Sequence, residues 1–314
     1  MSWAPIVLFT YNRPEHTRRT IDALKENIGA HDSVLYIFSD GPKDERQISV
    51  VQSVRSYLRC VDGFKSVKVV ERTFNMGLAA SIIRGVGEVL DQYSSVVVLE
   101  DDLVSAPSFL PFMNSALTAY QSRRDIFSIT GYNYPLPIPA DYPEPAYLSY
   151  RGSSWGWGTW SDRWKLVDWQ VRDFEELLRS KPAKARFARG GHDLLPMLIK
   201  QMNGEIDSWA IRFDYAHAKN GALCLHPVRS LIQNIGFDGT GVHCGMTDEF
   251  DVELEQGMRH LNLNPNIAVD PDILRIFNER FCPVPSVKWA DIQSRSLLRR
   301  LVRKIRVRTG FGEK

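Results

Sequence analysis

The sequence predicts an α/β protein with a mostly parallel central sheet flanked by helices. Short apolar segments alternate with segments of helical periodicity, several apolar segments end in polar residues, and no apolar run is long enough to cross a bilayer. With 314 residues, 44% of them hydrophobic, the chain can bury a full core as one large domain or two closely joined domains.

The first half of the chain is predicted to alternate strands and helices. The first helix begins after an Asn-Arg-Pro break, which is typical of a helix start. In chain order, the elements are a strand at 5–9, a helix at 14–28, strands at 34–38 and 67–70, a helix at 79–90 and a strand at 96–99. Parallel sheets built from such units bind ligands at the carboxyl edge of their strands.

Polar residues follow three of these strands. They are Thr10, Tyr11, Asn12 and Arg13 after the first, Asp40 after the second, and Glu100, Asp101 and Asp102 after the last. Three adjacent carboxylates repel one another, so such a cluster favours a bound cation, although a solvated acidic turn is the plain alternative. Because the three strand ends share one edge, we expect them to form a nucleotide site. No glycine-rich dinucleotide or P-loop motif is present.

Together with Asn-Met-Gly-Leu-Ala-Ala at 75–80 and Ala-Pro-Ser-Phe at 106–109, these residues resemble the GT-A fold glycosyltransferases. They are similar to the N-acetylglucosaminyltransferase I group and to bacterial family 2-like enzymes that build surface polysaccharides, including lipopolysaccharide. The resemblance runs from Ile6 to about Cys244, and Glu-Asp-Asp at 100–102 corresponds to the DxD motif. It implies an inverting hexosyltransferase whose cofactor is a divalent cation, Mn²⁺ or Mg²⁺. The implied donor is a nucleoside diphosphate sugar, best a UDP-N-acetylhexosamine, and the implied acceptor is a glycan or lipid-linked glycan.

The resemblance also implies roles for individual residues. Asp102 would bind the metal, Glu100 and Asp101 would reach the ribose or metal-bound water, Asp40 would bind the base, and Arg13 would face the phosphates. The full set of implied donor-binding residues is Thr10, Tyr11, Asn12, Arg13, Asp40, Asn75, Arg84, Glu100, Asp101, Arg151, Trp155 and Trp157.

Five of the eight tryptophans lie between residues 150 and 169. Tryptophan faces stack on the apolar faces of sugars, and Trp155 and Trp157, among glycines, are the predicted sugar contacts. Trp160 and Trp164, four residues apart on an expected helix, are predicted to be core. Arg151 is implied to lie where the donor-sugar site begins.

The resemblance places a catalytic base in Gly-Glu-Ile-Asp-Ser-Trp at 204–209. Direct displacement at the anomeric carbon requires a base for the acceptor hydroxyl, and the Asp-x-Trp spacing selects Asp207, with Glu205 as the runner-up. Asp193 and Asp214 are further options, and Asp214 also fits a structural ion pair. The glycines at 236, 239 and 241, with Phe237 and His243, predict either a loop that closes over the donor or ordinary turns.

Charge divides the chain unevenly. Residues 288–314 contain nine Lys or Arg and two acids, and subtracting this +7 from the whole-chain +2 leaves −5 on residues 1–287. Leu297, Leu301 and Ile305 share one helical face, so the tail is predicted to be a basic amphipathic helix. Such a helix either binds an anionic membrane surface or packs on the body. Nucleic acid is not expected, because the body is acidic and no aromatic residues interleave the basic ones.

These features predict a division into a nucleotide-sugar half (1–130), an acceptor and catalytic half (131–287) and the tail (288–314). The oligomeric state is left open. No signal segment is evident and the four cysteines form no pair, so we expect a cytoplasmic protein, peripheral on the cytosolic face of the inner membrane. A metal pair at His243 and Cys244 is a weak option. Two alternative functions stay open: a sugar-nucleotide nucleotidyltransferase, and a non-catalytic protein that binds carbohydrate or nucleotide sugar.

Overall fold

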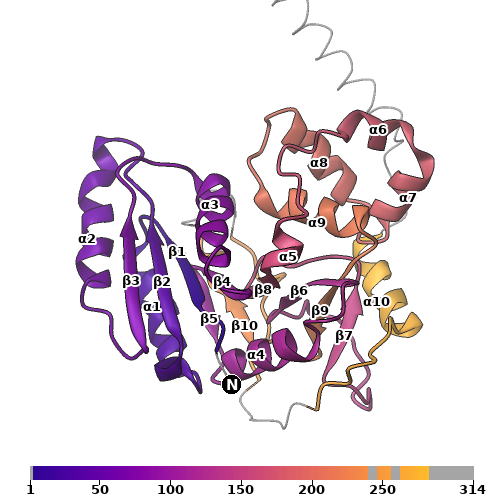
Figure 1. Cartoon of the computed structure of the whole chain (residues 1–314), viewed down its shortest axis with the longest axis horizontal. Helices are drawn as coiled ribbons and strands as arrows, with labels where there is room; N and C mark the ends of the chain where they lie inside the picture. Colours follow the sequence, from indigo (N-terminus) through magenta and orange to yellow (C-terminus); the bar gives the residue numbers. More distant parts are fainter. Residues whose placement is uncertain (1–2, 240–245, 256–261, 283–314) are drawn as a thin grey trace, which may run out of the picture.

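Figure 1 shows the computed structural model of the chain, which describes residues 3–239, 246–255 and 262–282. The strands are β1 (Ile6–Thr10), β2 (Val34–Ser39), β3 (Ser66–Glu71), β4 (Ser95–Glu100), β5 (Leu103–Ser105), β6 (Ile126–Thr130), β7 (Ala146–Ser149), β8 (Trp157–Trp160), β9 (Leu223–Pro227) and β10 (Ile232–Asn234). The α-helices are α1 (Pro14–Lys25), α2 (Ile48–Leu58), α3 (Leu78–Leu90), α4 (Phe109–Ala119), α5 (Ser161–Trp164), α6 (Phe174–Arg179), α7 (Lys181–Ala188), α8 (Leu194–Met202), α9 (Trp209–Lys219) and α10 (Pro271–Phe281). Short 3₁₀ helices lie at Ala30–Asp32 and Glu45–Gln47.

Eight strands form one sheet in the order β3-β2-β1-β4-β8-β6-β9-β7. Strands β1 to β4 are mutually parallel, and β6 is parallel to β9. Strand β8 is antiparallel to both of its neighbours, and β7 is antiparallel to β9. Strands β5 and β10 form a separate antiparallel ribbon. The predicted fold class, a mostly parallel sheet flanked by helices, is confirmed.

Helices cover both faces of the sheet, which explains why its central strands are apolar at consecutive positions. On one face, Leu8 and Leu99 belong to a core that includes residues of α1, α2 and α4. On the other face, Val7 and Val98 pack with residues of α3 and α9. The strand ends therefore remain the part of the sheet that can meet a ligand.

The predicted elements of the first half are all present, with bounds shifted by a few residues. The helix predicted at 14–28 ends at Lys25, and Gly29 then turns the chain with a φ of 85°. Helix α2 is additional, since no predicted element covers it. The regular β-α order explains this agreement, because each element is defined by its own local periodicity.

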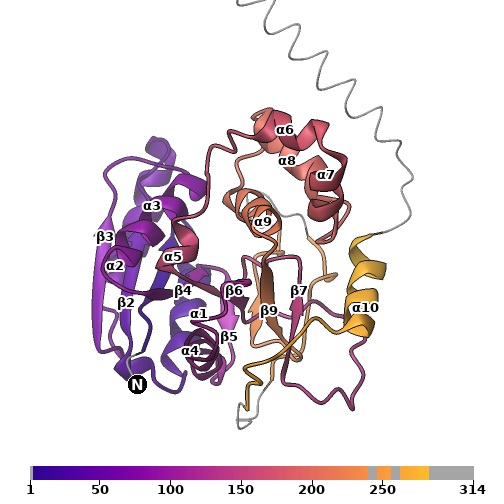
Figure 2. The same ribbon diagram turned by 45° about the vertical axis from the view of Figure 1, so that its right-hand side comes forward.

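The second half of the chain carries its own small apolar cluster. Residues of α6, α7, α8 and α9 build it, with Phe187, Leu198 and Ile211 among its buried members. Figures 1 and 2 show these helices together at the β6–β9 end of the sheet, with α10 beside β7. One sheet runs through both halves, so the division at residue 130 stays a prediction.

The prediction that Trp160 and Trp164 share a helix is wrong, because Trp160 ends β8 and Trp164 ends α5. Their predicted burial is confirmed, with 2% and 6% of each residue exposed. The indole N–H of Trp160 donates to the carbonyl of Leu117 at 3.0 Å, which satisfies its polar atom inside the core.

Several predicted features lie outside the described residues: Gly241, His243, Cys244 and the basic tail at 288–314. Among the cysteines that the structure does describe, Cys60, Cys224 and Cys282 are free thiols. No helix within the described ranges is long and apolar enough to span a membrane.

Candidate active site

The ends of β1 and β4 lie side by side and bring two of the predicted polar segments together. Phe9 pairs with Glu100 in parallel register, so Thr10–Arg13 borders the strand-end acids, by which we mean Glu100, Asp101 and Asp102. The backbone N–H of Tyr11 donates to the Asp101 carboxylate at 3.2 Å. The Thr20 hydroxyl donates to the Asp101 carbonyl at 2.9 Å, which ties α1 to the same turn.

Burial and crowding make the strand-end acids hard to ionise together. Burial raises the pKa of the Glu100 carboxyl well above its usual range, and the charges of Asp102 and Asp101 raise it further. Burial, then the charge of Asp102, raises the pKa of Asp101 to about 7, against the lowering effect of the Tyr11 N–H. Burial also raises the pKa of Asp102, while Arg13 lowers it. A nearby cation would relieve all three shifts.

Arg13 supplies a positive charge at this turn. Its Nη1 lies 2.9 Å from Oδ2 of Asp102, and the two side chains are 15% and 21% exposed. Arg13 also contacts His16 and Asp238, two residues that the sequence did not single out. His16 follows Arg13 by three positions at the start of α1, and this helical spacing could have indicated from the sequence that the two side chains are neighbours. Asp238 comes from the segment after β10, 225 residues further along the chain, and has no such signal.

Asp40, at the end of β2, organises the loop before α3. Its carboxylate accepts N–H bonds from Gly41, Met76 and Gly77 at 2.9–3.1 Å. The side chain of Asn75 donates to the carbonyl of Gly41 at 2.9 Å and closes the same loop. These bonds engage both carboxylate oxygens, so the structure gives Asp40 a loop-holding role, and its predicted contact with the base stays a prediction.

Two further residues of the first loop are tied to the segment after β2. The Asn12 amide donates to Gln47 Oε1 at 2.6 Å. The Tyr11 hydroxyl accepts the N–H of Lys43 at 3.0 Å. These contacts fix the segment that was predicted to line the donor site.

The structure separates the two tryptophans predicted as sugar contacts. Trp157 is 1% exposed and stacks between Trp164 and Trp209, so the prediction that its face meets a sugar is wrong. The cause is β8, which places Trp157 inside the sheet layer against α3 and α9. Trp155 is partly exposed and packs edge-on against Phe237, at 5.5 Å between ring centroids. Its predicted sugar contact stays a prediction.

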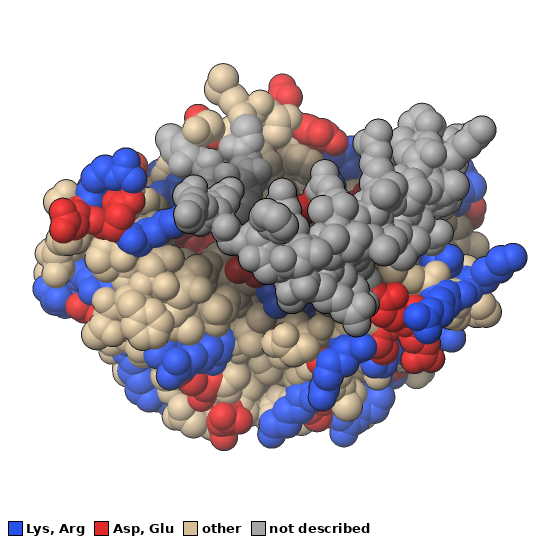
Figure 3. All heavy atoms as spheres, turned by 90° about the horizontal axis from the view of Figure 1, so that it is seen from above, with Lys and Arg blue, Asp and Glu red and all other residues tan. Residues whose placement is uncertain are grey.

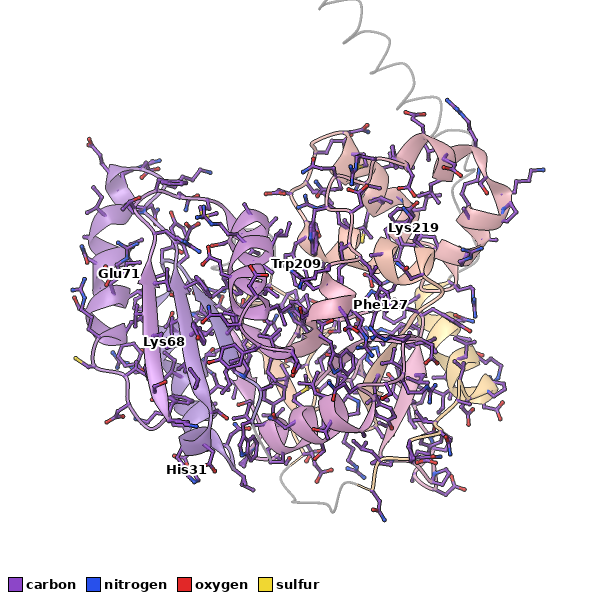
Figure 4. All side chains as sticks on the ribbon, viewed as in Figure 1. His31, Lys68, Glu71, Phe127, Trp209 and Lys219 are labelled. Carbon is purple, nitrogen blue, oxygen red and sulfur yellow. The ribbon has the colours of Figure 1, made fainter. Side chains whose placement is uncertain are left out.

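Asp207 lies just before α9, at the side of the molecule where α9 meets α3. Ser208 caps α9 by accepting the N–H of Ile211, which leaves Asp207 as the last residue before the cap. Its side chain is 64% exposed and lies 3.2 Å from Arg212 Nη2. Trp209, two residues on, stacks on Trp157 at 4.7 Å, and Figure 4 shows Trp209 at the centre of the molecule.

These contacts give Asp207 a position relative to the strand-end acids. Trp157 pairs with Val98, two residues before Glu100. The start of α9 therefore packs next to the carboxyl end of β4. Glu205, the alternative base, accepts a hydrogen bond from the Asn203 amide at 3.1 Å.

Arg151 and Arg84 are engaged within the protein. The Arg151 guanidinium forms a bidentate pair with Asp193 at 2.8 and 2.9 Å and lies over the Phe281 ring, so it fixes the loop before β8, and its predicted donor contact stays a prediction. Asp214 accepts the N–H of Gly152 at 2.7 Å, and burial raises the pKa of its carboxyl to about 6. Arg84 pairs with Glu88 at 2.8 Å on an exposed face of α3, and its donor contact stays a prediction.

Within the described ranges, no group of three or more His, Cys, Asp or Glu side chains is arranged to hold a metal ion. Mg²⁺ at phosphate-transfer sites is commonly held by one or two carboxylates and completed by substrate phosphates, so a full protein cage is not required. The hard, partly exposed carboxylate of Asp102 fits that kind of donor set.

Two cavities lie apart from the strand-end acids. One, of about 160 Å³, is bordered by Pro5 and Ser95 at the opposite ends of β1 and β4. The other, of about 260 Å³, lies beside the proline-rich segment at 136–145. Figure 3 shows acidic and basic side chains interspersed on the part of the upper face that the described residues form.

Asp101→Asn is expected to flatten the pH dependence of stability. The Asp101 pKa is about 7 in the folded protein and about 3.9 in an unfolded chain, so folding favours the neutral acid. The neutral Asp101 carboxyl contributes fully to the free energy of unfolding below about pH 4. This contribution, at most about 4 kcal/mol, is lost as the pH rises through about 7. Asparagine keeps the shape and removes this titration.

Urea unfolding in EDTA-containing buffers across that pH range measures the effect. Asp141→Asn, at an exposed loop position, is the matched control. A slope for Asp101→Asn as steep as that of the parent would contradict the burial argument.

A family model described as Glycosyl transferase family 2 matches residues 6–179, more than half of the chain. A comparison with curated proteins found no match. Among solved structures, the chain is similar to TarS from S. aureus, with a TM-score of 0.40 and 12% identity. That match covers 73% of this chain and 36% of the TarS chain, so the chain spans about a third of TarS. The chain is also similar to the mannosyltransferase PcManGT from Pyrobaculum calidifontis, solved in complex with GDP-Man and Mn²⁺, with a TM-score of 0.39, 11% identity and coverage of 70% of each chain.

Proposed function

The chain belongs to glycosyl transferase family 2, and from this membership we propose that it is a metal-dependent, inverting glycosyltransferase. The donor is a nucleoside diphosphate sugar, with a UDP-N-acetylhexosamine as the first candidate. The acceptor is a glycan or lipid-linked glycan of a bacterial surface polysaccharide. The observation that supports this proposal most is the position of the strand-end acids, which lie at the carboxyl edge of the sheet beside Arg13.

Asp102 is the proposed metal ligand. A divalent cation, when bound there, neutralises the charge that develops on the leaving diphosphate. Glu100 and Asp101 are the proposed contacts for the ribose or a metal-bound water, and the Asp101 carboxylate also accepts the N–H of Tyr11. Arg13 is the proposed contact for the phosphates, since it is the guanidinium that already reaches Asp102.

Asp207 is the proposed general base. It removes the proton from the acceptor hydroxyl while the hydroxyl oxygen attacks the anomeric carbon opposite the leaving phosphate, which inverts the configuration. Its exposure of 64% leaves the carboxylate open to a substrate, and Arg212 Nη2 lies 3.2 Å from one of its oxygens.

A thermal-shift panel of UDP-, GDP- and dTDP-sugars, each with and without MnCl₂, tests the proposed function. We expect stabilisation by a UDP-N-acetylhexosamine that depends on Mn²⁺, because binding to the folded state alone raises the melting temperature. A shift with only GDP- or dTDP-sugars would reject the base assignment. No shift with any sugar nucleotide would reject the proposed function.

We also propose that the tail at 288–314 attaches the protein to the cytosolic face of a membrane, where a lipid-linked acceptor would be presented. This rests on its +7 charge and apolar stripe. Sedimentation with phosphatidylglycerol vesicles is expected at about 0.1 M salt and to weaken strongly at higher salt, because screening shortens the reach of surface charge. A variant that ends at Trp289 should stay in the supernatant, and equal sedimentation of that variant would defeat the proposal.

A further inference from the structure

Four polar side chains from three separate segments, Arg13, His16, Asp102 and Asp238, meet at the end of β4. Arg13 Nη1 lies 2.9 Å from Asp102 Oδ2, while Arg13 Nη2 lies 3.3 Å from Asp238 Oδ1. His16 Nε2 lies 3.0 Å from Asp238 Oδ2 and 2.8 Å from Arg13 Nη2. The Asp238 carboxylate is thus held by both basic side chains, one at each oxygen.

The segment that carries Asp238 rests directly on Asp102. The N–H of Ile235 donates to the Asp102 carbonyl at 2.9 Å. A Cβ placed on Gly236 would lie 2.2 Å from Asp102 Oδ2 and 3.1 Å from Arg13 Nη1, so only glycine allows this close approach. The approach brings Asp238 over the start of α1, where its side chain remains 42% exposed.

A metal diphosphate bound at this turn would make two charge interactions, and side chains of the protein already make both of them. A metal ion would place positive charge at Asp102, where the Arg13 guanidinium now lies. A diphosphate would place negative charge against Arg13, where the Asp238 carboxylate now lies. A carboxylate and a phosphate both accept hydrogen bonds from a guanidinium in the same planar fork geometry.

We propose that Arg13 and His16 together form the contact for the donor diphosphate, and that Asp238 occupies this contact when no donor is bound. This inference rests on the proposed function and adds two residues to it. On binding of a metal diphosphate, Asp102 would bind the metal in place of Arg13, and Arg13 and His16 would bind phosphate oxygens in place of Asp238. Asp238 is therefore a competitor of the donor, whereas His16 is a ligand contact.

This assignment predicts opposite effects for two neighbouring side chains. Asp238→Asn removes the competing charge and should tighten diphosphate binding roughly two- to fivefold, the range expected for a partly exposed ion pair. His16→Gln keeps a polar side chain but removes the imidazole, and should weaken binding by a similar factor. If Asp238 instead helped to hold the metal, Asp238→Asn would weaken binding.

Titration calorimetry of the full chain with UDP, GDP and dTDP, each with MnCl₂, measures these affinities. Asp248→Asn is the matched control, because it removes the same charge from a nearby described segment and corrects for the general effect of net charge. Melting temperatures confirm that each variant is folded.

Tighter binding by Asp238→Asn than by Asp248→Asn, with weaker binding by His16→Gln, supports the inference. Equal or weaker binding by Asp238→Asn, or parent-like binding by His16→Gln, overturns it while the proposed function stands. Absence of binding by the parent to all three diphosphates overturns the proposed function and this inference together.

Discussion

Asp207→Asn is expected to lower turnover by roughly 10²–10⁴-fold, the usual contribution of a positioned general base. Asparagine keeps the size and the polar contacts of the side chain but cannot accept the proton of the acceptor hydroxyl. Donor affinity should be nearly unchanged, because Asp207 lies before α9 and its ion-pair partner is Arg212, not a residue of the strand-end turn. Steady-state kinetics with separate donor calorimetry measures both quantities.

Glu205→Gln is the matched control, since Glu205 is two residues away and carries the same charge. Glu205→Gln should lower turnover much less than Asp207→Asn does, if the Asp-x-Trp spacing has selected the right acid. NMR of the product should show the anomeric configuration opposite to that of the donor. A fully active Asp207→Asn enzyme, or a product that retains the donor configuration, would defeat the assignment.

Asp102→Ala is expected to abolish the Mn²⁺-dependent part of donor binding and to lower turnover by roughly 10²-fold or more. The side chain of Asp102 is 21% exposed, and its Oδ2 lies 2.9 Å from Arg13 Nη1. Removing it leaves the cation without its protein ligand. The fold should survive, because the β4 backbone pairing with β1 ends at Glu100.

Calorimetry with and without MnCl₂ separates metal-dependent from metal-independent binding of the donor. Asp91→Ala, at the exposed end of α3, controls for the loss of one negative charge. Unchanged Mn²⁺-dependent affinity in Asp102→Ala would show that the metal is held elsewhere or is not used.

The first half of the fold could be predicted because each of its helices and strands has a recognisable pattern in its own sequence. Each of β1, β2 and β4 is a continuous apolar run, and α3 has a single apolar face. The second half depends on contacts between distant segments. Strand β8 inserts antiparallel between β4 and β6, which are separated from it by 27 or more positions in the sequence, and nothing local to Trp157 indicates this placement. Trp157 is therefore buried in the core, although the glycines beside it in the sequence favoured a ligand contact.

The candidate site divides in the same way. That the strand-end acids and Arg13 lie together could be predicted, because strand ends of a parallel sheet share an edge. The role of Asp40 could not, since its carboxylate is directed by the backbone of Met76 and Gly77 across the loop before α3. Asp238 could not be found either, because its partners Arg13 and His16 lie more than 220 positions away.

The proposed role of Asp102 as metal ligand can be checked by locating Mn²⁺ in the protein. Crystals of the protein grown with MnCl₂ and UDP would reveal the ion by its anomalous scattering. We expect one Mn²⁺ at about 2.1 Å from a carboxylate oxygen of Asp102, coordinated also by diphosphate oxygens. An ion bound away from the end of β4, or UDP bound at that edge with no metal between it and Asp102, would contradict it.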